Sequence, residues 1–156
     1  GSFGKRGLGY AVEPLKKQLW AILGLSKRWK VALVGAGRMG AALFEYPHFR
    51  TRGFEFVSVF DSDPMKIGTR WSGLRIESAK VLEDSLRENP VEIVILTVPG
   101  QSAQEVTDAV VRAGVLGILN FAPVQLRVPS DVTVKDVHMV MELEALSFAL
   151  SQTKGE

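Results

Sequence analysis

The sequence predicts a Rossmann-like α/β fold, in which a doubly wound, mainly parallel sheet carries helices on both faces. Residues 31–40 read Val-Ala-Leu-Val-Gly-Ala-Gly-Arg-Met-Gly, an apolar strand that runs into a G-x-G-x-x-G turn. A second apolar run, 54–60, ends in Asp61, about 20 residues after the last glycine, the spacing typical of dinucleotide-binding folds. Residues 91–98 are apolar apart from Glu92 and Thr97, as in a strand covered on both faces. Together these patterns favour a parallel sheet.

The first half of the chain follows this plan. We expect residues 1–11 to be a linker or tag remnant and 12–156 to be one dinucleotide-binding domain. Residues 12–23 form an expected helix with Pro14 in its first turn and an apolar stripe made by Leu15, Leu19, Ile22 and Leu23. The elements expected next are strand 30–34, helix 38–46 ended by Pro47, strand 55–60 and a turn at 61–64.

The second half continues the alternation of strands and helices. Pro99 and Gly100 end the apolar strand 91–98, and Gly114 closes the helix that follows it. The expected elements are strand 74–76, helix 79–88, strand 91–98, helix 102–113, strands 118–121 and 132–134, and helix 137–150. This order requires right-handed crossovers, which place helices on both faces of the sheet.

The glycine turn and Asp61 predict a dinucleotide site. Gly35 lets the chain turn sharply, Gly37 leaves room for a pyrophosphate, and Gly40 lets the next helix pack close to the sheet. The predicted site also includes the turn residues Ala36, Arg38 and Met39. Asp61 can accept hydrogen bonds from ribose hydroxyls, which favours NAD(H) over NADP(H), although Arg38 could still reach a phosphate. The alternative is a tight turn in another α/β protein, with Asp61 capping a loop.

Composition excludes several classes of protein. With 156 residues, 46% of them hydrophobic and 23% charged, the chain fits one globular domain. The absence of cysteine excludes disulfides, thiol catalysis and cysteine-based zinc sites, and no metal-ligand cluster is apparent. No apolar run approaches the ~20 residues that cross a bilayer, so we expect a cytoplasmic protein without membrane contact. The basic residues among 1–30 indicate either a solvated face or a nearby polyanion such as DNA.

The sequence offers no catalytic group for the predicted cofactor. The two histidines, His48 and His138, lie in an expected turn and at the start of the last helix. No Tyr-x-x-x-Lys arrangement, no triad and no substrate domain can be identified beside the glycine turn. We therefore expect a binding site without chemistry rather than an enzyme.

Several motifs in order give the chain a resemblance to one family. They are Phe3-Gly4-Lys5-Arg6-Gly7-Leu8-Gly9-Tyr10, the glycine turn, Phe60-Asp61-Ser62-Asp63-Pro64, Thr97-Val98-Pro99 and Gly117-Ile118-Leu119-Asn120-Phe121-Ala122-Pro123-Val124. From residue 3 to about 150 the chain resembles the C-terminal dinucleotide-binding domain of Rex, a family of redox-sensing transcriptional repressors. The resemblance implies an N-terminal winged-helix domain that is absent here, and NAD(H) as cofactor. It also implies a homodimer in which the last helix, 137–150, is swapped between subunits.

The resemblance also assigns roles in the site. The glycines would hold the pyrophosphate and Asp61 the adenosine ribose, and the strand end Thr97, Val98 and Pro99 would border the ribose and phosphates. The residues expected near the nicotinamide are Asn120, Phe121, Ala122, Pro123 and Tyr46. Tyr46 could instead pack its ring on the core. Members of the family release operator DNA when NADH binds, and burying the cationic ring of NAD⁺ among apolar side chains would make NADH the tighter ligand.

One position departs from the family pattern. Histidine stands at 138, where the family carries an acidic residue that contacts the tyrosine matching Tyr46 and an arginine of the partner's DNA-binding domain. A weakened or pH-dependent response to NADH is therefore expected. Two other functions stay open: a small NAD(P)-dependent oxidoreductase fragment, and a CoA-binding Rossmann domain, against which Asp61 argues.

Overall fold

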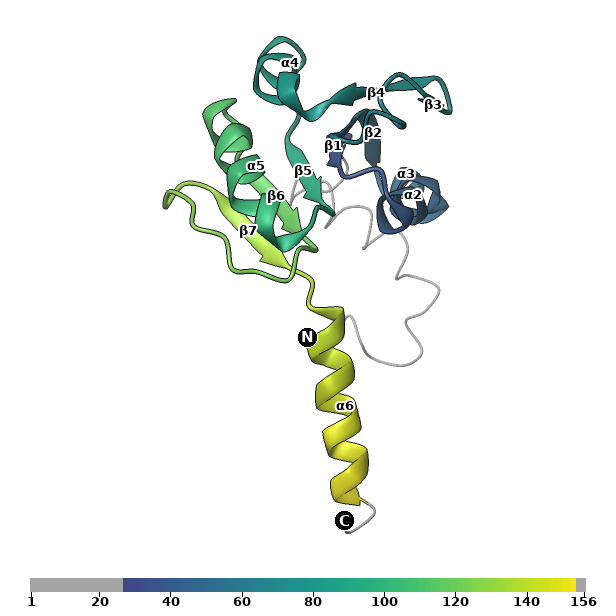
Figure 1. Cartoon of the computed structure of the whole chain (residues 1–156), viewed down its shortest axis with the longest axis vertical. Coiled ribbons are helices and arrows are strands. Elements are labelled where there is room, and N and C mark those ends of the chain that lie inside the picture. Colours follow the sequence, from purple (N-terminus) through teal and green to yellow (C-terminus); the bar gives the residue numbers. More distant parts are fainter. Residues whose placement is uncertain (1–26, 154–156) are drawn as a thin grey trace, which may run out of the picture.

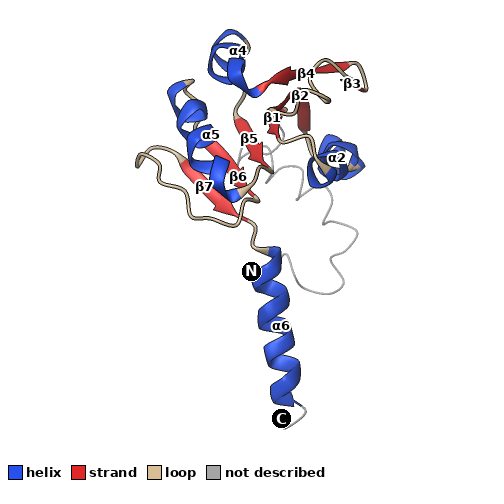
Figure 2. Cartoon of the chain, in the orientation of Figure 1, coloured by secondary structure: helices blue, strands red, loops and turns tan. Residues whose placement is uncertain are grey.

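A seven-stranded sheet forms the centre of the computed structural model, which describes residues 27–153 (Figure 1; Figure 2). The strands are β1 (Trp29–Val34), β2 (Phe54–Asp61), β3 (Arg70–Trp71), β4 (Leu74–Ser78), β5 (Ile93–Leu96), β6 (Gly117–Asn120) and β7 (Thr133–Asp136). Their order in the sheet is β3-β4-β2-β1-β5-β6-β7, and every neighbouring pair is parallel except β3 with β4. The predicted doubly wound α/β fold is confirmed.

Helices flank the two faces of this sheet. They are α2 (Arg38–Glu45), α3 (Pro47–Thr51), the 3₁₀ turn η2 (Ala79–Val81), α4 (Leu82–Glu88), α5 (Gly100–Arg112) and α6 (Met139–Thr153). Helices α4 and α5 pack against each other on one face, whereas α2 and α3 lie against β1 and β2 on the other. The expected helix 12–23 lies outside the described residues.

The strand residues alternate between two apolar clusters because successive side chains point to opposite faces. Val94 and Leu96 of β5 are fully buried in the cluster under α4 and α5, together with Phe60. Ile95 lies in the second cluster, with Leu33 of β1. Burial on both faces explains why the central strands are continuously apolar in the sequence.

Local structure differs from expectation in two places. We expected a turn at residues 46–49, but Pro47 begins the short helix α3, because proline fits the first helical position. Strand β3 was not anticipated: it pairs with β4 through a tight hairpin whose residues Ser72 and Gly73 both have positive φ, 48° and 88°. The remaining boundaries shift by a few residues; α5, for example, begins at Gly100 rather than at 102.

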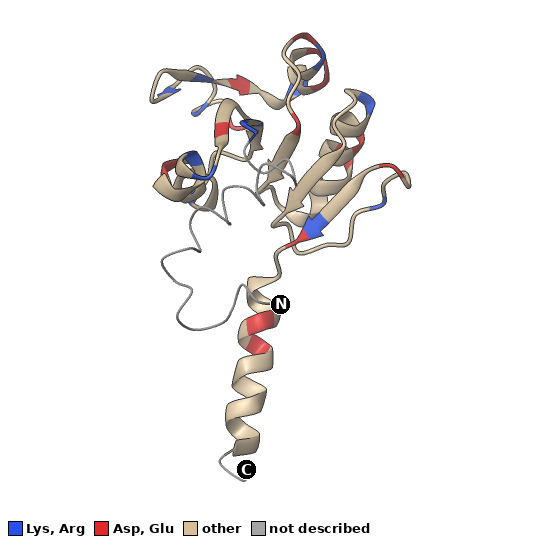
Figure 3. Ribbon diagram, turned by 180° about the vertical axis from the view of Figure 1, so that it is seen from behind, with Lys and Arg blue, Asp and Glu red and all other residues tan. Residues whose placement is uncertain are grey.

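Helix α6 extends away from the sheet (Figure 1). None of its residues is buried, and its exposed apolar side chains are Met139, Val140, Met141, Leu143, Leu146, Phe148 and Leu150. Figure 3 shows that basic and acidic residues are spread over the domain that contains the sheet, whereas most of α6 is uncharged. Exchange of this helix between subunits stays a prediction. No helix within residues 27–153 combines the length and the apolar character needed to span a membrane.

Candidate functional site

A cavity of about 640 Å³ opens where the carboxyl ends of the parallel strands meet helices α4 and α5. Ligands of open α/β sheets bind at this edge, where the direction of winding reverses. Here the reversal falls between β1 and β5. Six predicted site residues line the cavity: Gly35, Gly37, Asp61, Thr97, Val98 and Pro99. The cavity therefore coincides with the predicted pyrophosphate and adenosine positions.

The three glycines of the turn have different roles. Gly35 has φ +111°, and a Cβ there would lie 2.5 Å from the Thr97 Oγ1 atom, so both conformation and space require glycine. A Cβ at Gly40 would overlap the carbonyl oxygen of Gly35. Gly37 has φ −82°, and a Cβ there would meet no atom within 4 Å. Two glycines thus build the turn, and the third leaves open space at the cavity.

Two helix N-termini at the cavity have no acidic residue in their first turn. Gly37 is the N-cap of α2 and Pro99 that of α5; neither helix has a side-chain cap or an acid in its first turn. The first N–H groups of a helix need partners from outside the helix, and its dipole favours negative charge there. This end of the cavity suits phosphate groups.

The Asp61 carboxylate is held in a fixed orientation by two backbone N–H groups. Its Oδ2 atom accepts a hydrogen bond of 2.6 Å from Ala36, and its Oδ1 atom accepts one of 2.8 Å from Asp63. Each carboxylate oxygen keeps a lone pair for a further donor. Asp61 therefore ties the end of β2 to the glycine turn and can still accept hydrogen bonds from a ribose.

Lys66 belongs to the site although the sequence analysis did not identify it. Its Nζ atom donates a 2.8 Å hydrogen bond to the carbonyl oxygen of Ala36, and the residue lines the cavity. The turn after Asp63 brings it there, because the Lys66 N–H donates to the carbonyl oxygen of Asp63. The turn at residues 61–64, which contains Pro64, was the signal in the sequence that could have identified Lys66. A turn directly after β2 brings the next residues back toward the end of that strand. Ala36 is therefore held on its N–H side by Asp61 and on its carbonyl side by Lys66.

Thr97 supports the turn rather than offering its hydroxyl to the cavity. The Oγ1 atom donates to the carbonyl oxygen of Gly35 at 2.8 Å, and the Thr97 N–H bonds the carbonyl oxygen of Val34. Beyond it, the wall is made by Leu82, Val98, Pro99 and Ser102. These mainly apolar surfaces suit a flat base.

A salt bridge closes the far end of the cavity. Glu83 of α4 binds Arg112 of α5 at 2.8 Å and Arg87 at 2.6 Å. The hydrogen bond from Arg112 is the main cause that lowers the pKa of Glu83, and the same bond raises the pKa of Arg112. The Glu83–Arg112 salt bridge joins α4 to α5 and places charged groups in this wall of the cavity.

Four of the predicted nicotinamide residues, Asn120, Phe121, Ala122 and Pro123, lie together in the loop 120–124, outside the lining of the cavity. The buried Asn120 side chain donates from Nδ2 to the Val124 carbonyl oxygen (3.0 Å) and to Asp136 Oδ1 (2.9 Å), and its Oδ1 accepts the Ala122 N–H (2.9 Å). Asn120 thus shapes the loop 120–124 and joins β6 to β7. Asp136, which the sequence analysis missed, also lies 3.9 Å from His138 Nε2.

The remaining predicted residues are spread around the turn and the loop. Arg38 and Met39 are exposed, and Ala36 and Gly40 are buried beneath the turn. Phe121 is partly buried, Ala122 buried and Pro123 exposed. Tyr46 is 49% exposed and its ring lies edge-on to Phe49, at 5.0 Å between centroids. This exposure disfavours the alternative in which the Tyr46 ring is part of the core.

The arrangement suits binding of an extended anionic nucleotide. Among residues 27–153, no group of three or more His, Cys, Asp or Glu side chains could hold a metal ion. The geometry instead offers uncapped helix N-termini, a fixed carboxylate and an apolar wall.

Comparisons with known proteins agree with this arrangement. Residues 26–124 match the family model described as CoA binding domain. The redox-sensing transcriptional repressors Rex of Desulfitobacterium hafniense and Carboxydothermus hydrogenoformans are each 47% identical over 148 residues. These alignments cover 95% of this chain and 70% and 71% of the relatives.

Solved structures of a Rex-family repressor, RSP, are also similar. The complex of RSP with β-NADH superposes with a TM-score of 0.83 at 35% identity, covering 92% of this chain and 69% of that one. The complex with β-NAD⁺ and operator DNA gives a TM-score of 0.88 at 36% identity, covering 99% and 71%.

Proposed function

Because the chain belongs both to the Rex family of redox-sensing transcriptional repressors and, through residues 26–124, to the CoA binding domain family, we propose that its cavity binds NAD(H) and senses the redox state of this cofactor. Proteins of the first family are regulators rather than enzymes, and so is this chain. The observation that carries the proposal is the cavity of about 640 Å³ at the strand ends, whose lining includes the glycine turn and Asp61.

Each part of the cofactor has a matching surface. The pyrophosphate would lie at Gly37, where open space meets the N-termini of α2 and α5. The adenosine ribose would donate to the free lone pairs of Asp61, and the adenine would lie against Leu82 and Val98. The nicotinamide would extend to the loop 120–124, near the exposed ring of Tyr46.

NADH would bind more tightly than NAD⁺ because of charge. The oxidised nicotinamide ring is a cation, whereas the reduced ring is neutral. Burial of the cation among Phe121, Ala122 and Pro123 has a desolvation cost that burial of the neutral ring does not have. Asp136, the acid that ends β7, is already engaged by Asn120 and lies near His138. A neutral amide does not cancel the charge of Asp136, so the preference for NADH requires the nicotinamide ring to lie closer to the apolar loop residues than to this carboxylate.

Helix α6 would form the dimer. At 3.6 residues per turn, Leu143, Leu146 and Leu150 share one side of this helix, and Met141 and Phe148 share the opposite side. A helix that is apolar on two sides is typically enclosed rather than laid on a single surface. Insertion between two surfaces of a partner subunit, with exchange of the two α6 helices, would bury both sides. The DNA-binding domain that the family carries would precede residue 3.

The junction between the domain and α6 would transmit the redox signal. His138 stands at this junction, between β7 and α6, and contacts Asp136, which Asn120 links to the loop 120–124. A ligand that changes this loop would therefore act on the base of α6. Histidine stands here where the family pattern has an acidic residue, so the release of DNA on NADH binding would be weaker than the family pattern implies.

Calorimetric titration of NADH, NAD⁺, NADPH and CoA, with wild type and Asp61→Asn, tests the proposal. We expect the wild type to bind NADH most tightly and Asp61→Asn to bind it at least ten-fold more weakly. The Tm of Asp61→Asn should also fall, because the asparagine amide can accept from only one of the two N–H groups that the carboxylate holds. CoA binding in preference to NADH would favour the function that the matched family model names. Equal affinities for NADH and NAD⁺ would contradict redox sensing.

A further inference from the structure

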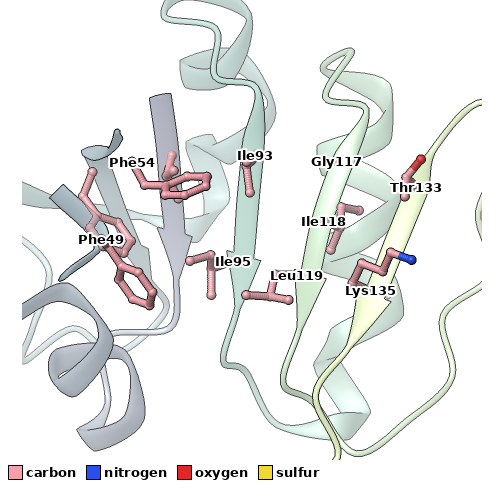
Figure 4. A pocket seen from close by; sticks show the side chains of 11 residues that line it. Phe49, Phe54, Ile93, Ile95, Gly117, Ile118, Leu119, Thr133 and Lys135 are labelled. Atoms are coloured by element: carbon pink, nitrogen blue, oxygen red, sulfur yellow. The ribbon is translucent and has the colours of Figure 1, made fainter. Parts of the chain in front are cut away.

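Residues 121–132 join β6 to β7 without forming a helix or a strand, and we refer to them as the β6–β7 connection. This connection includes most of the loop 120–124, which is proposed to contact the nicotinamide. β7 lies directly beside β6 in the sheet, where Leu119 and Lys135 are neighbours on the two strands (Figure 4). Because the two strands are parallel, the connection has to run back along the sheet before β7 begins. Its path therefore decides where the loop 120–124 lies.

The β6–β7 connection runs on the face of the sheet that carries α4 and α5. Leu126 and Val128 pack against the apolar cluster under these helices, whereas the opposite face of the sheet carries a separate apolar pocket of about 290 Å³ (Figure 4). Arg127, between these two residues, has an exposed side chain and lies outside the strands. Its backbone N–H and C=O groups therefore need partners other than a neighbouring strand.

Gln104 of α5 supplies both of these partners. Its Oε1 atom accepts a 2.8 Å hydrogen bond from the Arg127 N–H, and its Nε2 atom donates at 2.9 Å to the Arg127 carbonyl oxygen. Nε2 also donates at 2.8 Å to Oδ1 of Asp108, one helical turn further along α5. Both hydrogens of Nε2 and the side-chain oxygen are thus engaged, which holds the amide in one orientation. The Gln104 amide pairs with Arg127 as a neighbouring strand would.

The β6–β7 connection also touches α5 at the first residue of this helix. A Cβ at Gly100 would lie 2.9 Å from the Val124 Cγ1 atom, so Val124 lies directly against the N-terminus of α5. Gly100 and Gln104 are about 6 Å apart along the helix axis. Helix α5 therefore supports the connection at two points, and the first point lies at the helix N-terminus that is proposed to bind the pyrophosphate.

We propose that Gln104 is a positioning residue for the nicotinamide half of the cofactor, an inference that rests on the proposed NAD(H) function. With the pyrophosphate at the N-terminus of α5 and the nicotinamide at the loop 120–124, the hydrogen bonds of Gln104 fix the separation between the two sites. Asn120 holds the connection at the Val124 carbonyl oxygen, and Gln104 holds it further along, at Arg127. Gln104 does not line the cavity, so it acts through the connection. Without its amide, the loop occupies the binding position for a smaller fraction of the time, and the affinity falls by the same factor.

Titration of NADH and of ADP-ribose, which lacks the nicotinamide, tests this role. Gln104→Met removes the amide but keeps the length of the side chain and a good helix former in α5. We expect its affinity for NADH in calorimetry to fall about 3- to 10-fold, while its affinity for ADP-ribose stays within about two-fold of wild type. Gln125→Met is the matched control, because the exposed Gln125 side chain lies in the same connection and makes no hydrogen bond within residues 27–153. This control should bind both ligands as the wild type does.

The outcomes of this titration separate the role of Gln104 from the proposed function. Equal losses of affinity for NADH and ADP-ribose in Gln104→Met, or no loss of either, would overturn the role of Gln104 and leave the NAD(H) function standing. Failure of the wild type to bind either ligand would overturn the NAD(H) function, and the role of Gln104 with it.

Hydrogen exchange tests the contact between Gln104 and Arg127 in protein without cofactor. The Arg127 N–H has its partner in Gln104 Oε1, so its exchange, followed by NMR, should be about five-fold faster or more in Gln104→Met than in wild type and in Gln125→Met. The N–H of the fully buried Val94 in β5 should exchange equally in all three proteins. Unchanged exchange at Arg127 would overturn the proposal, and so would an equal acceleration at Val94, which would show a general loss of stability.

Discussion

Gly37→Ala separates the binding function of the glycine turn from its structural function. Gly37 adopts φ −82°, which alanine accepts, and the new Cβ would meet no protein atom within 4 Å. We therefore expect its free energy of unfolding to stay within about 0.5 kcal/mol of wild type. The same methyl group would project into the space proposed for the pyrophosphate. Loss of one hydrogen bond to a charged group costs about 1.5–3 kcal/mol, so the affinity for NADH should fall roughly 10- to 150-fold.

The assay pairs calorimetric titration of NADH with thermal unfolding in the absence of cofactor. Gly40→Ala is the matched control, because its Cβ would overlap the Gly35 carbonyl oxygen, and we expect it to lose stability and NADH binding together. Unchanged NADH affinity in Gly37→Ala would refute the placement of the pyrophosphate. A loss of stability as large as that of Gly40→Ala would refute the distinction between the two glycines.

Three further predictions concern other parts of the chain. Lys66→Met removes the hydrogen bond to Ala36 and a positive charge at the cavity. The affinity for NADH, measured by calorimetry, should therefore fall about 3- to 10-fold. An unchanged affinity would show that Lys66 is not needed for binding. Leu146→Glu places a charge on one apolar side of α6 and should convert the proposed dimer into a monomer in light scattering, whereas Ser151→Glu, outside both apolar sides, should not. The hydrogen bond from the Lys30 N–H, assisted by Lys27, holds the pKa of Glu92 below its ordinary value of 4.5. The unfolded chain therefore binds this proton more readily, and stability falls as the pH drops through and below that value. Glu92→Gln should make the decline of Tm between about pH 5 and pH 3 less steep. The effect should correspond to less than about 1 kcal/mol, because Glu92 is partly exposed. An unaltered decline would contradict this assignment.

The fold could be predicted because its signals are local. The apolar runs of β1 and β5, the glycine turn and the position of Asp61 each lie within a short stretch of sequence, and all appear where expected. The short helix α3 could not be predicted in the same way, because Pro47 both ends one helix and begins another.

The side-chain partners could be predicted only in part. Lys66 and Asp136 lie 30 and 16 residues away from the groups they bind, Ala36 and Asn120, so no sequence window contains both partners. Asn120 was placed correctly beside its loop, but its amide is fully engaged by loop and strand atoms. Such contacts depend on which strand ends become neighbours, and this becomes visible only in the folded sheet.

The double engagement of Asp61 constrains how cofactor preference could change in this protein. Acquiring affinity for a 2′-phosphate would call for removal of the negative charge at this position, yet the same carboxylate holds the Ala36 N–H and so shapes the turn that is proposed to bind the pyrophosphate. A substitution at Asp61 that accommodates the 2′-phosphate would also weaken the turn proposed to hold the two phosphates of the pyrophosphate. Preference could shift only if a second residue first took over the hydrogen bond to Ala36. This barrier of two coordinated changes would tie the protein to one redox pool over evolutionary time.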